Sequence, residues 1–297
     1  MDDSRTDGCY LFSYFTGKGQ DGLRLAASRD GRLWTPLGDN HIFLKPEVGE
    51  SRLMRDPHLF QGPDGTFHLV WTTSWNGQTI GYASSSDLIH WSEQRALRVM
   101  ANKPECRNCW APELAFDEAS GEFVILWSST VAGHFEATAG TCEDAYNHRI
   151  YVCRTRDFVT LSPAQLMFDP GYSVIDASLV RRGDCWHLVY KDETRYPEAH
   201  KYLQCVSGLS PFGPWSTPSE PISPSWVEGP APLQINGSFL IYYDVYRNGC
   251  YGAVRTRDFI TWEDIGSVSM PPGARHGTAL AVPQEIISQV MARLASA

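Results

Sequence analysis

The sequence lacks several features that would place it in a common class of protein. Its 297 residues contain no run of 18 apolar residues, so we expect no transmembrane helix and no membrane partner. Acidic residues outnumber basic ones, 34 to 25, and the formal net charge is −9. Binding to nucleic-acid phosphates requires a basic stripe, and none is visible. The charge therefore argues against a nucleic-acid partner.

The cysteines also lack a defining pattern. Cys106 and Cys109 form a C-x-x-C pair, but no second pair stands at zinc-ribbon spacing, so structural zinc is not favoured. A disulfide between these two residues would require an oxidising compartment. The first residues, Met1–Ser4, are acidic and polar, without the basic and apolar regions of a signal peptide. We therefore expect either a cytoplasmic protein or one whose leader has been removed, and the compartment stays open.

What the sequence does contain is an internal repeat. Five segments rich in aromatic and β-branched residues each follow a turn, which is typical of β-strands. They span residues 8–14, 65–71, 121–127, 184–190 and 237–243. A second segment type follows each of them and runs from Ser or Thr through Asp to Trp in its clearest copies, such as Ser28 to Trp34. We expect its Asp to accept hydrogen bonds from nearby backbone N–H groups and so to fix a turn.

A third segment type precedes four of the aromatic strands, at residues 55–60, 110–115, 175–180 and 228–233. Its fifth copy appears only near the end of the chain, at residues 275–282. Five such units predict an all-β fold, a five-bladed β-propeller whose last blade is closed by the N- and C-terminal strands together. We expect residues 1–297 to form a single catalytic domain, with a short C-terminal helix over residues 284–294.

Acidic residues gather on the third segment type. In a propeller the first strand of each blade lines the central channel, so residues near the start of these strands converge on one pocket. These strands carry Asp56, Glu113, Asp176, Glu228 and His276. Neighbouring carboxylates raise one another's pKa at a partly desolvated axis, so a cluster of acids there suggests a functional site. Each acid alone could equally cap a strand or turn, but we interpret Asp56, Asp176 and Glu228 as equivalent positions of their blades.

Two carboxyl groups that flank a sugar bond are sufficient for glycoside hydrolysis. One donates a proton to the leaving oxygen, and the other activates water or attacks the sugar directly. A third carboxylate beside the acid can raise its pKa and orient it. The three acids therefore predict a glycosidase site.

The motifs of the repeat, in their order along the chain, resemble those of glycoside hydrolase family 43 from Tyr10 to Val282. They are Arg55-Asp56-Pro57, Trp110-Ala111-Pro112-Glu113, Ile175-Asp176, Glu228-Gly229-Pro230 and His276-Gly277. The resemblance implies a five-bladed propeller that inverts anomeric configuration and acts mainly on arabinose- and xylose-containing plant polysaccharides. It implies Asp56 as general base, Glu228 as general acid and Asp176 as the residue that modulates the pKa of the acid.

The resemblance also suggests that His276, near the channel axis, helps to hold a structural calcium ion or a water cluster beneath the sugar. No cofactor is otherwise required. Two positions depart from the family pattern: Glu113 stands where an acid is structural more often than catalytic, and Asp176 is followed by Ala-Ser where Pro-Ser is common. Neither departure removes an essential carboxylate, so we expect an active enzyme.

Five further residues are candidates for binding the substrate. Trp75 and Trp110 can supply the aromatic platform that a sugar ring requires, although Trp is often only structural. His58, in Asp-Pro-His, is expected to face the pocket, the alternative being that it satisfies backbone groups. Lys191 follows the fourth aromatic strand and either pairs with an acid or forms a surface salt bridge. Arg275 is expected to bond substrate hydroxyls or an acid.

Together these features predict an inverting, exo-acting glycosidase that removes arabinofuranosyl units, with xylosyl units second. We expect a monomer that acts on a carbohydrate, with the loops 131–148 and 192–203 shaping its specificity. A retaining glycosidase or a fructosyl-transferring relative would hold its two carboxyl groups ~5–5.5 Å apart, against ~6.5–9.5 Å for an inverting enzyme. The non-enzymatic alternative is a carbohydrate-binding propeller, whose binding would survive neutralisation of the three acids.

Overall fold

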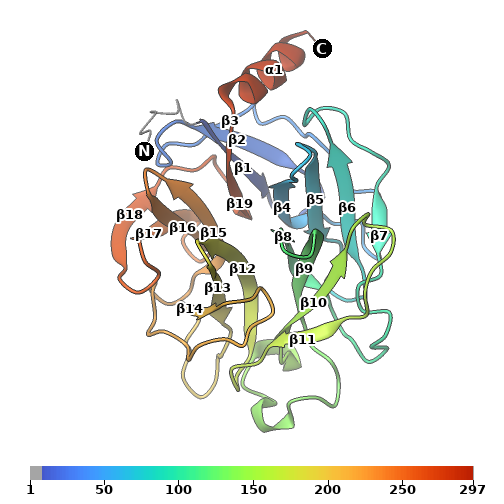
Figure 1. The fold of residues 1–297 in the computed structure, drawn as a ribbon, viewed down its shortest axis with the longest axis vertical. Coiled ribbons are helices and arrows are strands. Elements are labelled where there is room, and N and C mark those ends of the chain that lie inside the picture. The colour runs from blue at the N-terminus through green and yellow to red at the C-terminus, as the bar shows by residue number, and fades with distance from the viewer. Residues whose placement is uncertain (1–8, 297) are drawn as a thin grey trace.

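The computed structural model describes residues 9–296 of the chain, and the features predicted at Met1–Ser4 and Gly8 lie outside this range. Five β-sheets surround a central axis as the blades of a propeller (Figure 1). Within each blade, neighbouring strands are antiparallel. The predicted all-β, five-bladed fold is confirmed.

Four blades are built from consecutive strands. Blade 1 contains β4 (Arg55–Gln61), β5 (Phe67–Thr72), β6 (Ile80–Ser85) and β7 (Arg95–Leu97). Blade 2 contains β8 (Trp110–Asp117), β9 (Glu122–Ser129), β10 (Arg149–Thr155) and β11 (Gln165–Phe168). Blade 3 contains β12 (Val174–Arg182), β13 (Cys185–Asp192) and β14 (Leu203–Gly208). Blade 4 contains β15 (Glu228–Ile235), β16 (Ser238–Val245), β17 (Cys250–Thr256) and β18 (Glu263–Val268).

The fifth blade joins the two ends of the chain. It contains β19 (Arg275–Val282), β1 (Cys9–Phe15), β2 (Arg24–Ser28) and β3 (Thr35–Pro36). β19 pairs with β1 from Val282 opposite Cys9 to Arg275 opposite Phe15, so the predicted closure is confirmed. The inner strands contact one another in the order β4, β8, β12, β15, β19 and back to β4. The ring is therefore complete at its axis.

The Asp of the second repeated segment forms the predicted turn. Asp87 Oδ1 accepts hydrogen bonds from the backbone N–H groups of Ile89 and His90, at 2.9 and 2.8 Å. Three other copies accept the same pair of bonds from the residues two and three positions later: Asp30, Asp157 and Asp258. The side chain thus satisfies backbone donors that the strand no longer pairs.

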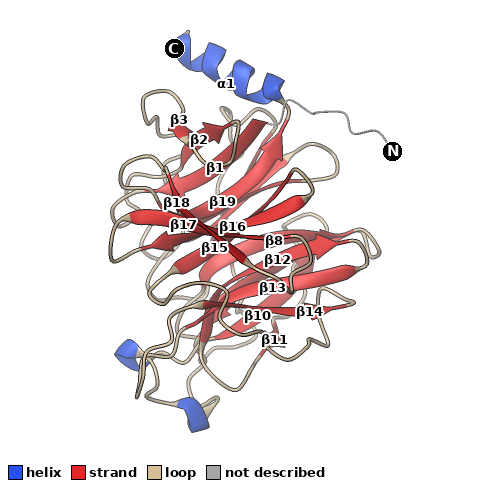
Figure 2. Cartoon of the chain, turned by 90° about the vertical axis from the view of Figure 1, so that its left-hand side faces the viewer, coloured by secondary structure: helices blue, strands red, loops and turns tan. Residues whose placement is uncertain are grey.

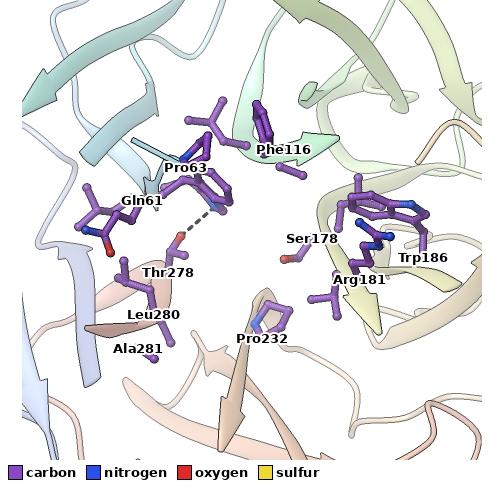
Figure 3. Close-up of a pocket in the computed structure, with 18 of the residues that line it drawn as sticks. Gln61, Pro63, Phe116, Ser178, Arg181, Trp186, Pro232, Thr278, Leu280 and Ala281 are labelled. Carbon is purple, nitrogen blue, oxygen red and sulfur yellow. Dashed lines mark hydrogen bonds between the residues drawn. The ribbon is translucent and has the colours of Figure 1, made fainter. Parts of the chain in front are cut away.

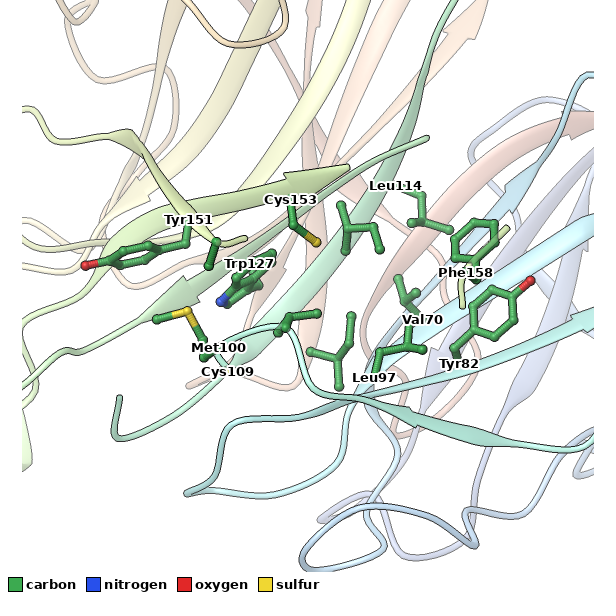
Figure 4. Close-up of a cluster of buried hydrophobic side chains, with 14 of the residues drawn as sticks. Val70, Tyr82, Leu97, Met100, Cys109, Leu114, Trp127, Tyr151, Cys153 and Phe158 are labelled. Carbon is green, nitrogen blue, oxygen red and sulfur yellow. The ribbon is translucent and has the colours of Figure 1, made fainter. Parts of the chain in front are cut away.

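The hydrophobic core is divided among the five interfaces between neighbouring blades. Between blades 1 and 2, for example, Val70, Tyr82, Leu114, Trp127 and Phe158 pack together (Figure 4). Fully burying a large apolar side chain of this kind contributes about 1.5–3 kcal/mol relative to exposure. Each blade packs against a neighbour on both sides, so its inner strand is fixed in position around the axis.

The helix α1 (Gln284–Ala295) follows β19 and lies outside the ring of blades (Figure 2). Its buried residues Ile287 and Val290 join the cluster between blades 5 and 1. Two short 3-10 helices, Glu136–Thr138 and Glu143–Ala145, lie in the loop between β9 and β10. Among residues 9–296, no helix is both long enough and apolar enough to span a membrane.

Candidate active site

Each inner strand is interrupted by a bulge near its start. The pairing of the strand with its neighbour skips between Arg55 and His58, Trp110 and Glu113, Ile175 and Ser178, Glu228 and Ala231, and Arg275 and Thr278. A bulge turns side chains away from their regular direction. Since it falls at the same place in all five strands, it sorts the residues around the axis into three levels, here named the rim level, the bulge level and the channel level.

The bulge level holds two of the predicted catalytic acids. Its residues are Asp56, Ala111, Asp176, Gly229 and His276. Asp56 and Asp176 have positive φ angles of 50° and 52°, a left-handed conformation that costs a non-glycine residue of order 1–3 kcal/mol. Ala111, at the same level, has a φ of 45°, so the conformation belongs to the bulge, and at Asp56 and Asp176 it directs both carboxyl groups into the same space.

The third acid, Glu228, lies at the rim level, one residue before the bulge. This level comprises Arg55, Trp110, Ile175, Glu228 and Arg275. The prediction that Asp56, Asp176 and Glu228 occupy equivalent positions is therefore wrong for Glu228. The physical reason is that Gly229 holds the bulge position of its strand, where an added Cβ would lie 2.5 Å from the ring of His276. A side chain cannot fit there, so the acid projects from the preceding residue.

The channel level lies further along the inner strands. Its residues are His58, Glu113, Ser178, Ala231 and Thr278. His58 is buried, and its Nδ1 lies 3.0 Å from the hydroxyl of Thr278 and 3.6 Å from Glu113. The structure thus places His58 outside the pocket that the acids line, contrary to the prediction, because the bulge separates it from Asp56. Glu113 is buried beside it, away from the catalytic acids.

The rim and bulge levels open into one cavity of about 230 Å³, here named the carboxylate pocket. It is lined by Arg55, Asp56, Thr72, Trp75, Trp110, Ile175, Asp176, Lys191, Glu193, Glu228, Tyr246, Arg275 and His276. The three predicted catalytic acids therefore meet, together with four of the five predicted substrate-binding residues. The pocket is smaller than the ~300–1,000 Å³ typical of sites for drug-sized ligands, which favours a single sugar residue.

Asp56 is held in its ionised form. The hydroxyl of Thr72 donates a hydrogen bond to its Oδ2 at 2.8 Å, and Nδ1 of His276 lies 3.4 Å from its Oδ1. Burial alone would raise the pKa of Asp56, but the hydrogen bond and charge of His276, aided by Arg55 and Thr72, lower this pKa to about 2. The carboxylate is thus available as a proton acceptor at neutral pH.

Asp176 is biased towards its protonated form. Burial raises the pKa of Asp176 to about 7, and although the charge of His276 opposes this shift, the negative charge of Glu228 adds to it. The backbone N–H of Asp176 donates to the hydroxyl of Ser128 in the neighbouring blade, at 3.1 Å, and Gly229 N–H donates to Asp176 Oδ2 at 3.2 Å. These bonds fix the carboxyl group beside the strand that carries Glu228.

Glu228 lies between two cations. Lys191 Nζ is 3.3 Å from its Oε2, and a guanidinium nitrogen of Arg275 is 3.0 Å from its Oε1. Burial would raise the pKa of Glu228, but the charges of Lys191 and Arg275 lower it overall. Lys191 is buried and pairs with Glu228, which is the first of its two predicted alternatives; the surface salt bridge is not formed. Because Asp176 and Glu228 interact, the two carboxyl groups titrate as a coupled pair, and a proton lost from the pair is not assigned to one residue alone.

His276 is the cation shared by the two bulge-level acids. Its Nδ1 faces Asp56 and Asp176, whose charges raise the pKa of the imidazole to about 9 although burial alone would lower it. A protonated imidazole donates from both nitrogens and has no free lone pair for a metal. Within residues 9–296, no three His, Cys, Asp or Glu side chains are arranged to hold a metal ion. The calcium ion that the resemblance implies does not fit this arrangement, and no step below depends on one.

Two tryptophans form one wall of the carboxylate pocket. The rings of Trp75 and Trp110 meet edge to face at 5.7 Å, and the Nε1–H of Trp110 donates to the backbone oxygen of Trp75 at 3.1 Å. Tyr146, from the loop 131–148, packs on Trp110 at 4.5 Å between ring centroids. Trp75 remains 45% exposed, and the guanidinium of Arg55 lies over its ring, 4.4 Å from the centroid. The role of both tryptophans as a sugar platform stays a prediction.

Five pocket residues have no predicted role, of which Ile175 is apolar and the other four are polar or charged. Arg55 and Thr72 contact or face Asp56, and Arg55 directly precedes it in the Arg-Asp-Pro motif, which was the available signal. Glu193 follows Lys191 by two residues, within the segment where charged residues cluster after the fourth aromatic strand. Tyr246 lies in the connection after β16, and nothing in the sequence pattern marks it.

A second cavity, of about 550 Å³, begins at the channel level, where His58, Ser178 and Thr278 line it, and extends further along the inner strands (Figure 3). Its lining is largely apolar and includes Phe116, Trp186, Pro232 and Leu280. It contains none of the three predicted catalytic acids. The chemistry of the molecule therefore concentrates in the smaller, charged pocket.

Comparisons with known proteins agree with this fold. The sequence profile of a family described as "Probable glycosyl hydrolase domain", related to glycoside hydrolase family 43, matches residues 7–287. The chain belongs to this family of probable glycosyl hydrolase domains.

Individual relatives are more distant. An α-L-arabinofuranosidase of Bifidobacterium longum subsp. longum is 27% identical over 160 residues, which cover 47% of this chain but only 15% of the relative. An α-L-arabinofuranosidase from Lactobacillus brevis has a similar fold, with 17% identity and a TM-score of 0.56 over 71% of this chain and 72% of its own. A thermostable family-43 glycoside hydrolase is also similar, with 17% identity and a TM-score of 0.58 over 75% of this chain and 78% of its own. An exo-β-1,3-galactanase from Phanerochaete chrysosporium covers 73% of this chain at 13% identity, with 50% of its own chain matched and a TM-score of 0.55. At these identities the structures show the fold alone.

Proposed function

We propose that this glycosidase is an inverting, exo-acting enzyme that removes α-L-arabinofuranosyl units, with β-xylosyl units as the second candidate. The observation that carries the proposal is the opposite bias of two acids in one pocket: the pKa of Asp56 is lowered to about 2 and that of Asp176 is raised to about 7. Sites that perform acid and base catalysis together separate the pKa values of their carboxyl groups in this way.

Asp56 acts as the general base. An inverting enzyme activates a water molecule on the face of the sugar opposite the leaving group. Asp56 is ionised, and the hydrogen bond from Thr72 and the ion pair with His276 hold its two oxygens in place, so it can accept the proton of that water. The imidazolium of His276 keeps the carboxylate charged until the proton arrives.

Glu228 acts as the general acid and draws its proton from the pair that it forms with Asp176. In the substrate-free enzyme Lys191 and Arg275 favour ionised Glu228, so the proton of the pair rests on Asp176. Donation proceeds from the microstate in which Glu228 carries this proton. As the proton passes to the leaving oxygen, the two cations stabilise the carboxylate that remains. Asp176 thereby modulates the acid.

The identity of the sugar has weaker support than the reaction class. Two arabinofuranosidases stand among the similar proteins, but so do an exo-β-1,3-galactanase and a family 43 enzyme complexed with xylotriose. The small pocket, with its tryptophan wall, supports recognition of one terminal residue.

The test is a screen against 4-nitrophenyl α-L-arabinofuranoside, β-xyloside and β-galactoside, with the first-formed anomer followed by proton NMR. We expect release from the arabinofuranoside with inversion. A product of retained configuration would assign a retaining or transferring relative. Binding of arabinan without release of any sugar, unaffected by neutralising the three acids, would assign a carbohydrate-binding propeller.

A further inference from the structure

A chain of alternating charges connects the proposed acid to the two long loops. Lys191 Nζ lies 3.3 Å from Oε2 of Glu228 and 2.8 Å from Oε2 of Glu193. The other oxygen of Glu193 accepts a hydrogen bond from Nζ of Lys201. Lys201 Nζ in turn lies 3.4 Å from Glu143, in the loop between β9 and β10. Glu193 is thus the carboxylate that two lysines share.

Both lysines are removed from solvent. The side chains of Lys191 and Lys201 are 2% and 1% exposed, and a buried cation is stable only when anions are close to it. Burial would lower the pKa of Lys191, but Glu193 first, and then Glu228 and Asp176, raise it well above its ordinary value. Lys191 therefore stays charged, and it divides this charge between Glu193 and Glu228.

The second cation beside the acid is arranged in the same way. Arg275 bonds Glu228 with one nitrogen and Asp244 with another, at 3.0 and 2.7 Å. Each cation that contacts the proposed acid thus has a carboxylate of its own on the far side. This arrangement weakens the pull of both cations on Glu228, because an added negative charge near a carboxyl group favours its protonated form.

We propose that Glu193 is a positioning residue that limits the charge presented by Lys191 to Glu228, and so allows the Glu228–Asp176 pair to hold its proton near neutral pH. This inference rests on the proposed function, in which Glu228 is the acid. Glu193 acts through Lys191 and needs no contact with the reacting atoms. Glu193 and Glu228 lie close together, because each has an oxygen in contact with the same lysine nitrogen, at 2.8 and 3.3 Å.

Several other groups act on Glu228 and must be held constant in a test. They are Arg275 and His276 from β19, Asp56 from β4, Asp176 from β12, Asp244 from β16, Tyr251 from β17 and Tyr246 from the connection after β16. None of them contacts Glu193 by a hydrogen bond or ion pair among the described residues, so replacing Glu193 changes Lys191 and Lys201 first.

The main test is Glu193→Gln, which removes one negative charge at nearly constant shape. The ionisation of the Glu228–Asp176 pair is followed by infrared difference titration, through the signal of the protonated carboxyl group that is lost in Asp176→Asn. We expect the variant to lose this proton about one pH unit lower than the wild type, from Coulomb's law at this separation with a high effective dielectric constant. The alkaline limb of kcat/KM on 4-nitrophenyl α-L-arabinofuranoside should move in the same direction.

Two further variants make the test specific. Glu143→Gln removes the same charge from the exposed end of the chain, where Glu143 is 52% exposed, and should leave the titration in place. Lys201→Met releases Glu193 from its second lysine, so the titration should move to higher pH. This opposite sign keeps the inference testable if Glu193→Gln folds poorly, which thermal unfolding of each variant will show.

Titrations that coincide with the wild type in both Glu193→Gln and Lys201→Met would overturn the inference, as would equal shifts in Glu143→Gln. A wild-type protein that hydrolyses none of the three nitrophenyl glycosides would instead refute the proposed function. The infrared titration does not require turnover, so the two failures can be distinguished.

Discussion

Nδ1 of His276 lies 3.4 Å from Oδ1 of Asp56 and 3.8 Å from Oδ2 of Asp176, so one buried cation faces both bulge-level acids. The acids nevertheless respond differently. Burial would raise both pKa values, but Arg55 and Thr72 assist His276 at Asp56, whereas the charge of Glu228 opposes it at Asp176. The two strands are equivalent here, so it is the difference in neighbouring groups that shifts the pKa values of Asp56 and Asp176 in opposite directions.

The first prediction concerns this shared cation. His276→Gln removes the imidazolium that lowers the pKa of Asp56 to about 2, so this pKa should rise and the acidic limb of kcat/KM should move to higher pH by at least about one unit. The pH profile on the best nitrophenyl glycoside measures it. His58→Gln is the matched control, because His58 lies at the channel level outside the carboxylate pocket, and its limb should coincide with that of the wild type. An unmoved limb in His276→Gln would contradict the assignment.

The second prediction concerns the wild-type pH profile. The pKa of Asp176 is raised to about 7, so the acid pair keeps its proton below this pH and loses it as the pH rises through 7. The base Asp56, with a pKa of about 2, is ionised throughout that range. We therefore expect kcat/KM to be nearly constant between about pH 4 and 6 and to fall about tenfold per unit well above pH 7. A profile that stays flat to pH 9 would show that the pair does not supply the proton.

The fold could be predicted because each motif of the repeat is recognisable from a few consecutive residues. Aromatic strands, Asp turns and inner-strand motifs recur at the level of a few residues, and β19 was identified from a motif found far from its partner β1. The gathering of Asp56, Asp176 and Glu228 followed from the repeat and the resemblance.

The details that failed depend on packing between segments far apart in the chain. Glu228 stands one residue earlier than Asp56 and Asp176 because Gly229 meets the ring of His276 from another blade. His58 is only two residues from Asp56, yet the bulge places it at a different level. The contacts of Glu193 depend on two loops whose conformations no local pattern determines.

The third prediction tests the aromatic wall. Trp75 is 45% exposed, so Trp75→Ala should leave the core intact while removing a platform for the sugar. We expect KM to rise by about two- to tenfold with kcat changed much less, since aromatic contacts of this kind contribute about 0.5–1.5 kcal/mol. Trp75→Phe keeps an aromatic face and should recover part of the loss. Unchanged KM in Trp75→Ala would remove Trp75 from the binding site.

The fourth prediction tests the role of Glu228 as the proton donor. Glu228→Gln cannot donate, so hydrolysis of glycosides with poor leaving groups, such as an alkyl arabinofuranoside, should fall by about 10²–10⁴. A 2,4-dinitrophenyl glycoside leaves without protonation, and its hydrolysis should be nearly spared, because Asp56 and the rest of the pocket are unchanged. The ratio of the two rates therefore isolates proton donation from folding and binding. Glu113→Gln is the control, since it removes a buried acid of the channel level and should lower both rates by the same small factor or not at all. Equal loss on both substrates in Glu228→Gln would contradict the role of Glu228 as the proton donor.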